Sequence, residues 1–136
     1  MYLFDTDTLS NLVKKTPSSA LLSRLADIRR KEQFTTSITV GEMIYGAYKS
    51  NRTQYILNKL DQLLLPKLTV LPFDEPAARE YGRLRATLEK AGISIAEPDL
   101  RIASICLTRN LILITGNLNH FSKVPGLHVE NWMEEQ

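Results

Sequence analysis

The sequence predicts an α/β fold in which a central parallel sheet of about five strands is covered by helices on both faces. Short apolar runs typical of strands alternate with segments whose apolar residues recur at helical spacing. The strand-like runs lack the polar alternation of a sheet with one face in water, so both faces are expected to be buried. Alternating strands and helices favour a parallel sheet, because parallel neighbours need a crossover connection.

The elements are expected in a regular order. The first half holds a strand at 2–4, a helix from 6–8, a helix after Ser18 and Ser19, a strand at 34–38 and a helix opened by Thr39. The second half holds a helix at 55–64, a strand at 68–71, helices at 77–88 and 99–109, and strands at 111–114 and 127–130. Pro76, Gly92 and Pro98 suit the ends of these helices. No repeat or linker interrupts the pattern, so residues 1–136 are expected to form one domain.

Composition narrows the possible classes of protein. The chain has 136 residues, of which 43% are hydrophobic and 24% charged, as in ordinary globular proteins. Its net charge of +2 is compatible with a nucleic-acid substrate but does not identify one. One cysteine, Cys106, excludes an internal disulfide and a cysteine-rich zinc site, and two histidines argue against a histidine-built one. The N-terminus has no basic leader and no apolar run of signal-peptide length, so a cytoplasmic location is expected.

Polar residues stand where three of the predicted strands end, at Asp5, Ser37 and Thr115. In parallel sheets the ligand site lies beyond the carboxyl ends of the strands, where the strand order reverses. Asp5 could serve only as the N-cap of the following helix, but its position at a strand end favours a functional role. Asp7, two residues later, is expected to face solvent or to cap that helix.

Two further carboxylates lie near the starts of predicted helices. Glu42 follows Thr39 at the spacing of a capping box, which alone would make it structural. Its place just past the second strand, beside the end of the first, makes it a candidate site residue. Asp99 suits the positive end of a helix dipole. It also shares a core-facing stripe with Ala103 and Cys106, where charged residues are rare unless paired or bound to metal, and this favours function.

Other polar residues carry weaker indications. Glu97 is expected to be a solvent-facing cap residue or a partner of the metal ligands. Asn117 could cap the short helix before Phe121, or it could hydrogen-bond to a metal-bound water. His120 and Trp132 are expected to be packing or surface residues. One predicted helix also carries a basic face, which could be ordinary solvated surface or could contact phosphate. Its residues are Arg79, Arg83, Arg85 and Lys90.

Clustered carboxylates have few uses in water other than holding a hard cation such as Mg²⁺. Because they repel one another, at least one should have a raised pKa in the empty site. The cation would relieve that repulsion, polarise a phosphate oxygen and lower the pKa of a bound water, the source of the attacking hydroxide. If the acids converge, the sequence predicts a metal-dependent phosphodiester hydrolase. Asp5 would be the central ligand, and Asp99 and Glu42 would bind the ion directly or through water.

Residues 4–9 resemble the DxDxT signature of haloacid-dehalogenase-type phosphatases, and Thr115 could match the threonine that ends one of their strands. Those enzymes also need a downstream acidic pair to hold Mg²⁺. No aspartate follows Asp99, and the later glutamates lie in the C-terminal tail. This resemblance therefore fails.

A second resemblance covers nearly the whole chain. The segments LFDTDTLSNLV, TTSITVGEMIYGA and EPDLRIASICLTRNLILITGNLNHFSKVPGLHVENW are similar, in order and spacing, to PIN-domain ribonucleases of the VapC toxin type. The resemblance implies a PIN-like three-layer fold with a parallel sheet, a homodimer, and a VapB-type antitoxin whose C-terminal segment blocks the site. It implies that Asp5, Glu42 and Asp99 bind Mg²⁺ or Mn²⁺, and that the Thr115 hydroxyl steadies the first aspartate. Asn117 stands where many members have a fourth acid, although relatives with a similar TGN segment have a three-acid site.

The favoured hypothesis is therefore a Mg²⁺-dependent endoribonuclease toxin that cleaves structured RNA and is inhibited by a cognate antitoxin. An alternative from another class is a non-catalytic PIN-like domain that binds RNA or protein. It is suggested by Asn117, which stands where many members have a fourth acid. A haloacid-dehalogenase-like phosphatase is the weaker alternative.

Overall fold

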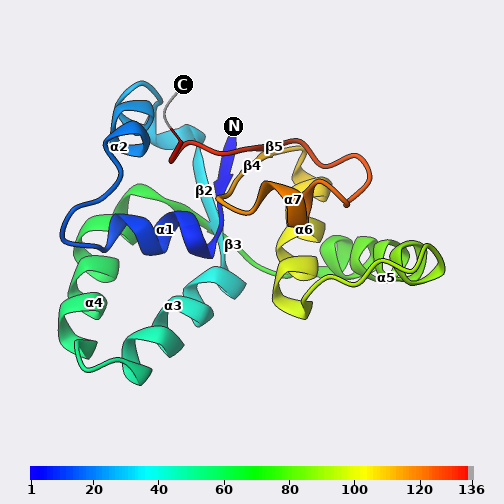
Figure 1. The fold of residues 1–136 in the computed structure, drawn as a ribbon, viewed down its shortest axis with the longest axis horizontal. Helices are drawn as coiled ribbons and strands as arrows, with labels where there is room; N and C mark the ends of the chain where they lie inside the picture. The colour runs from blue at the N-terminus through cyan, green and yellow to red at the C-terminus, as the bar shows by residue number, and fades with distance from the viewer. Residues whose placement is uncertain (135–136) are drawn as a thin grey trace.

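The computed structural model describes residues 1–134 and contains a five-stranded, all-parallel sheet in the order β3-β2-β1-β4-β5 (Figure 1). The strands are β1 (Tyr2–Phe4), β2 (Gln33–Thr36), β3 (Thr69–Leu71), β4 (Ile112–Ile114) and β5 (Val129–Glu130). This confirms the predicted sheet. The chain adds β2 and β3 on one side of β1 and then crosses to β4 and β5 on the other. The strand order therefore reverses between β1 and β4.

Helices cover both faces of this sheet, as predicted. They are α1 (Thr6–Leu12), α2 (Ser19–Ala26), α3 (Ser37–Lys49), α4 (Thr53–Lys59), α5 (Glu75–Lys90), α6 (Glu97–Arg109) and α7 (Leu118–Phe121). A π-helical turn at Leu60–Leu64 and 3₁₀ turns at Arg30–Glu32 and Leu65–Lys67 complete the regular structure. In Figure 1, α1 to α4 lie to one side of the strands, α5 and α6 lie to the other, and α5 projects from the body. Within residues 1–134, no helix is long and apolar enough to cross a membrane.

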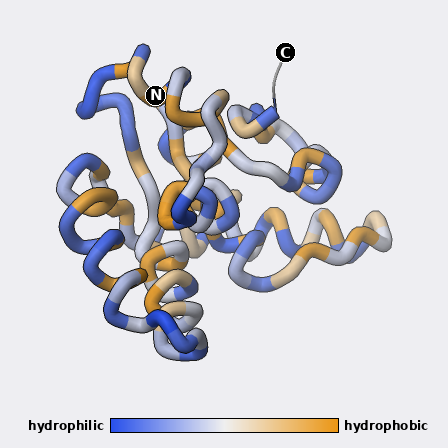
Figure 2. Tube along the Cα trace, turned by 60° about the vertical axis from the view of Figure 1, so that its left-hand side comes forward, coloured by the Kyte–Doolittle hydropathy of each residue, from blue (hydrophilic) through white to orange (hydrophobic). Residues whose placement is uncertain are grey.

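Adjacent residues of the two central strands point into separate hydrophobic cores. Leu3 and Leu113 pack with residues of α5 and α6, whereas Phe4 and Ile114 pack with residues of α1, α2 and α3. Because both sides of these strands are buried, their sequences are apolar without alternation. Figure 2 shows the complementary pattern in the helices, where hydrophobic and hydrophilic segments alternate along the tube. Most of the helices thus turn buried residues toward a core and other residues toward solvent, as in α2, α3 and α5.

The helix after β2 begins earlier than predicted. Thr36 is its N-cap, because the Thr36 hydroxyl accepts a hydrogen bond from the backbone N–H of Thr39 at 3.0 Å. The prediction that Thr39 opens the helix is therefore wrong, and so is the possible capping box with Glu42. Ile44 is also 36% exposed instead of sharing the buried face of Met43. Thr36 and Thr39 are equally good N-cap residues. The helix begins after Thr36 because the pairing of β2 with β3 ends at that residue.

Candidate active site

Residues that follow the carboxyl ends of β1 and β4 line a cavity of about 490 Å³. Its polar lining includes Asp5, Asp7, Glu42, Asp99 and Asn117. Asp5 directly follows β1, Glu42 lies in the second turn of α3, and Asp99 lies in the first turn of α6. The structure thus brings together the three acids that the sequence singled out. They meet where the strand order reverses, as expected for a parallel sheet.

Asp5 serves both as a helix cap and as the most buried acid of the cavity. Its side chain accepts a hydrogen bond from the backbone N–H of Thr8 at 3.2 Å, and the residue is only 4% exposed. Burial, followed by the hydrogen bond and charge of Asp7, raises the pKa of Asp5 to about 8, although Thr115 and Thr8 oppose this rise. The Asp5 carboxyl therefore holds its proton near neutral pH unless a cation stabilises the charged form.

Asp7 is exposed, yet it is neither a cap nor a purely solvated residue. Its Oδ2 accepts a hydrogen bond from the backbone N–H of Gly116 at 2.9 Å, and its Oδ1 lies 3.4 Å from the Thr115 hydroxyl, which donates to it. Of the two roles expected of Asp7, exposure to solvent is confirmed, whereas Asp5 and not Asp7 caps α1. The contacts with the loop after β4 were not expected. A side chain at Gly116 would place its Cβ 2.7 Å from Asp7 Oδ2, so glycine allows this approach. The contact depends on β1 and β4 being neighbours, which no local pattern reveals.

Glu42 is oriented by a residue that the sequence did not single out. The Thr6 hydroxyl donates a hydrogen bond to Glu42 Oε1 at 2.6 Å. Thr6 begins α1 immediately after Asp5, so the same chain segment supplies one acid and positions another. In the sequence, only the position of Thr6 next to Asp5 could have indicated a role for Thr6. The contact with Glu42 itself depends on the packing of α1 against α3.

Asp99 is half-buried and shares one stripe of α6 with Ala103 and Cys106. Both of these residues are fully buried, so the stripe faces the core as predicted. Its Oδ2 is 3.0 Å from Nε2 of His120, a residue of α7. Burial raises the pKa of Asp99; His120 opposes this effect, whereas the charges of Glu42 and Asp7 add to it. His120 was expected to be a packing or surface residue. Its buried Nε2 is close to Asp99 but has no aligned hydrogen-bond partner in residues 1–134.

The loop after β4 completes the cavity. The Thr115 hydroxyl accepts a hydrogen bond from the backbone N–H of Asn117 at 3.0 Å, and it also lowers the pKa of Asp5. Asn117 stands at the N-cap position of α7, but its side chain makes no capping hydrogen bond. The sequence left open whether Asn117 caps this helix or hydrogen-bonds to a metal-bound water. The missing capping bond disfavours the first role, and the residue lines the cavity.

Glu97 and the basic helix face lie outside this cavity. Glu97 accepts a hydrogen bond from Tyr81 and pairs with Arg101 at 3.0 Å. On α5, three of the four basic residues pair with glutamates of the same helix. These pairs are Arg79 with Glu75, Arg83 with Glu80, and Arg85 with Glu89. The basic face of α5 is thus an ion-paired, solvated surface.

The donors around the cavity suit a hard divalent cation. Carboxylate oxygens and an amide oxygen are the ligands that Mg²⁺ prefers, and Mg²⁺ keeps several waters, so few direct protein ligands are needed. Burial is the main cause of the raised pKa values of Asp5 and Asp99, and neighbouring carboxylates add to it: Asp7 acts on Asp5, and Glu42 and Asp7 act on Asp99. Within residues 1–134, however, no three His, Cys, Asp or Glu side chains are arranged closely enough to enclose one ion. Glu42 and Asp99 instead contact Thr6 and His120.

Comparisons with known proteins identify the family and agree with the fold. The family model of the PIN domain matches residues 2–127. From Rickettsia felis, ribonuclease VapC2 is 32% identical over 132 residues, covering 97% of this chain and 98% of that protein. The crystal structure of VapBC2 from the same organism, bound to a DNA fragment from its promoter, matches with a TM-score of 0.88 and 32% identity over 96% of this chain and 98% of that one.

Two further relatives extend the comparison. A tRNA(fMet)-specific endonuclease VapC from Salmonella typhimurium is 30% identical over 131 residues, covering 96% of this chain and 97% of that protein. The crystal structure of VapBC-5 from Mycobacterium tuberculosis, a member of the VapBC family of toxin–antitoxin systems, has a TM-score of 0.62 and 28% identity. That match covers 74% of this chain and 81% of the other.

Proposed function

The chain belongs to the PIN-domain family, and on this premise we propose that it is a divalent-metal-dependent endoribonuclease and the toxin of a toxin–antitoxin pair. The observation that carries the proposal is the single cavity lined by Asp5, Glu42 and Asp99 at the point where the strand order reverses. Relatives named as a ribonuclease and as a tRNA-specific endonuclease support hydrolysis of a phosphodiester in RNA.

Asp5, Glu42 and Asp99 would hold Mg²⁺ or Mn²⁺ directly or through water. A bound ion of this kind supplies polarisation of a phosphate oxygen and a water of lowered pKa. The protein holds two of the carboxylates in place: the backbone N–H of Thr8 donates a hydrogen bond to Asp5, and the Thr6 hydroxyl donates one to Glu42. The Thr115 hydroxyl donates to the neighbouring Asp7 and lowers the pKa of Asp5. The Asn117 amide takes the place of a fourth acid and would hydrogen-bond to water or to substrate.

The substrate and partners follow from the relatives. We propose structured RNA as the substrate, because a relative of similar length is named for a transfer RNA. We also propose that the protein acts in the cytoplasm, where it would meet such a substrate. We propose a VapB-type antitoxin as the partner, because a structural relative belongs to a family of toxin–antitoxin systems. A homodimer is proposed from the family resemblance alone.

The proposal is tested by incubating the purified protein with a transfer RNA transcript in Mg²⁺, in Mn²⁺ and in EDTA. We expect discrete cleavage products with either metal and none with the chelator. Release of inorganic phosphate from p-nitrophenyl phosphate, measured in parallel, should be absent. Phosphate release would instead favour the phosphatase alternative, and RNA binding without cleavage of any RNA class would favour the non-catalytic domain.

Removing the hydroxyl that orients Glu42 should weaken metal binding. In Thr6→Val the side chain keeps its shape but loses the donor, so the Glu42 carboxylate is no longer held toward the cavity. We expect Mn²⁺ affinity, measured by isothermal titration calorimetry, to fall by about tenfold, as is usual when a hydrogen bond to a metal ligand is lost. Thr6→Ser keeps the donor and should retain nearly normal affinity. Equal affinities of the valine and serine variants would contradict the assigned role of Thr6.

A further inference from the structure

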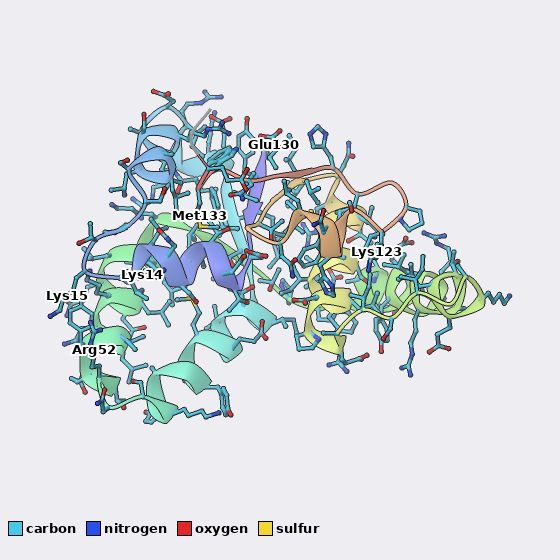
Figure 3. All side chains as sticks on the ribbon, viewed as in Figure 1. Lys14, Lys15, Arg52, Lys123, Glu130 and Met133 are labelled. Carbon is cyan, nitrogen blue, oxygen red and sulfur yellow. The ribbon has the colours of Figure 1, made fainter. Side chains whose placement is uncertain are left out.

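Four basic residues lie together beside the acidic cavity. Lys14, just after α1, lines the cavity itself, and Lys15 follows it. Arg52 occupies the N-cap position of α4, and Lys59 is the last residue of that helix. Figure 3 shows Lys14, Lys15 and Arg52 on the same side of the molecule, at the end of α1 and at the turn that precedes α4. We call Lys14, Lys15, Arg52 and Lys59 the basic cluster.

Direct contacts link Arg52 and Lys59 to one aromatic ring, and Lys59 to the backbone of Lys14. The Lys59 ammonium donates a hydrogen bond to the Lys14 carbonyl at 3.2 Å. The Arg52 guanidinium carbon lies 4.3 Å, and the Lys59 ammonium 5.1 Å, from the centre of the Tyr55 ring. A hydrogen bond with Lys59, followed by the charges of Lys59, Arg52 and Lys15, lowers the pKa of Tyr55. The ring restricts two flexible cations, so less entropy is lost when they bind an anion.

The cluster lacks the acidic partners that neutralise other basic residues of the chain. None of its four cations has a carboxylate oxygen within 4.0 Å in residues 1–134. The arginines of α5 differ, because each of Arg79, Arg83 and Arg85 is paired with a glutamate. Neighbouring unpaired cations repel one another, and a polyanion that bridges them would relieve this repulsion.

We propose that the basic cluster binds the phosphate backbone of the RNA on one side of the phosphodiester that is cleaved. The inference rests on the proposed function and locates part of its substrate site. An acidic cavity repels phosphate, so affinity for RNA must come from cations nearby, and Lys14 joins the cavity to the cluster. Contacts of this type position a nucleic acid without reading its sequence.

The test compares two triple variants of equal charge change. Lys15→Gln/Arg52→Gln/Lys59→Gln removes three cations of the cluster, whereas Arg79→Gln/Arg83→Gln/Arg85→Gln removes three paired cations of α5. Lys14 stays unchanged because it lines the cavity.

Binding of fluorescently labelled bulk transfer RNA is measured by anisotropy in EDTA over a range of salt concentrations. We expect the cluster variant to bind about tenfold or more weakly and to lower the salt slope by about 2, because each lost phosphate contact removes roughly 0.7–0.9. The α5 variant should bind within about twofold of the unchanged protein, because each of its three arginines is already paired with a glutamate.

Equal losses in the two triple variants would overturn the inference, as would the absence of transfer RNA binding by the unchanged protein. Thermal unfolding checks that each variant is folded. If the cluster variant is not, Lys15→Gln and Arg52→Gln are measured singly, and each should lower the salt slope by about 0.7–0.9. Cleavage is scored separately in Mg²⁺. Cluster-dependent binding without cleavage would refute the nuclease and leave only the phosphate contacts of the cluster established, whereas cleavage with an unchanged salt slope would refute the inference alone.

Discussion

Asp5→Asn and Asp99→Asn are each expected to reduce RNA cleavage by about a thousandfold or more. Both substitutions keep the size of the side chain but remove a charge proposed to hold the divalent ion, whose stabilisation of the transition state amounts to several kcal/mol. Asp5 should be the more sensitive, because it is the deepest acid of the cavity. Initial rates on a transfer RNA transcript at saturating Mg²⁺ measure the effect, and calorimetric titration with Mn²⁺ should show a parallel loss of binding.

A control for these variants must be an acid outside the cavity. Asp27, the exposed C-cap residue of α2, meets this condition, and Asp27→Asn should cleave normally. Asp7→Asn is not a neutral control, because the Asp7 carboxylate contacts Gly116 and raises the pKa of Asp5. Full activity of either Asp5→Asn or Asp99→Asn would refute the proposed metal site.

The metal-free protein is expected to lose stability as the pH rises from about 4 to 8. Asp5 has a pKa of about 8 in the folded protein and an ordinary value of 3.8. Between these values the folded state binds more protons than the unfolded state, so the stability contributed by this group is complete below the lower pKa and is lost as the pH approaches the upper one. The free energy of unfolding should therefore fall by up to about 1.4 kcal/mol per pH unit from this group. The raised pKa of Asp99 acts in the same direction.

Asp5→Asn isolates this contribution, because an amide mimics the protonated carboxyl and does not titrate. In urea unfolding with EDTA present, the variant should become more stable than the unchanged protein as the pH rises, by about 2–4 kcal/mol more at pH 8 than at pH 5. Parallel pH profiles for the two proteins would contradict the raised pKa. A variant that gains stability while losing activity would show that the charged site is maintained at a cost to folding.

The order of strands and helices was predictable because the helices repeat apolar residues at helical spacing, whereas the buried strands are short continuous apolar runs. Apolar pairs such as Leu3–Phe4 and Leu113–Ile114 indicated strands covered on both faces, and the structure confirms this by placing each pair in two different cores. The start of α3 was predicted wrongly because Thr36 and Thr39 are equally suitable caps locally. Pairing of β2 with β3 through Thr36 decided between them.

The sequence by itself determined the parallel α/β class and the three acids Asp5, Glu42 and Asp99, because strand ends and helix starts are local features that a pattern can locate. Only the tertiary structure decided how these acids are held. Thr6 reaches Glu42 across 36 positions, and Asp7 reaches Gly116 across 109. Such contacts depend on which strands and helices become neighbours. Helical and strand periodicity carries no information about that choice, which is made by the packing of the whole chain.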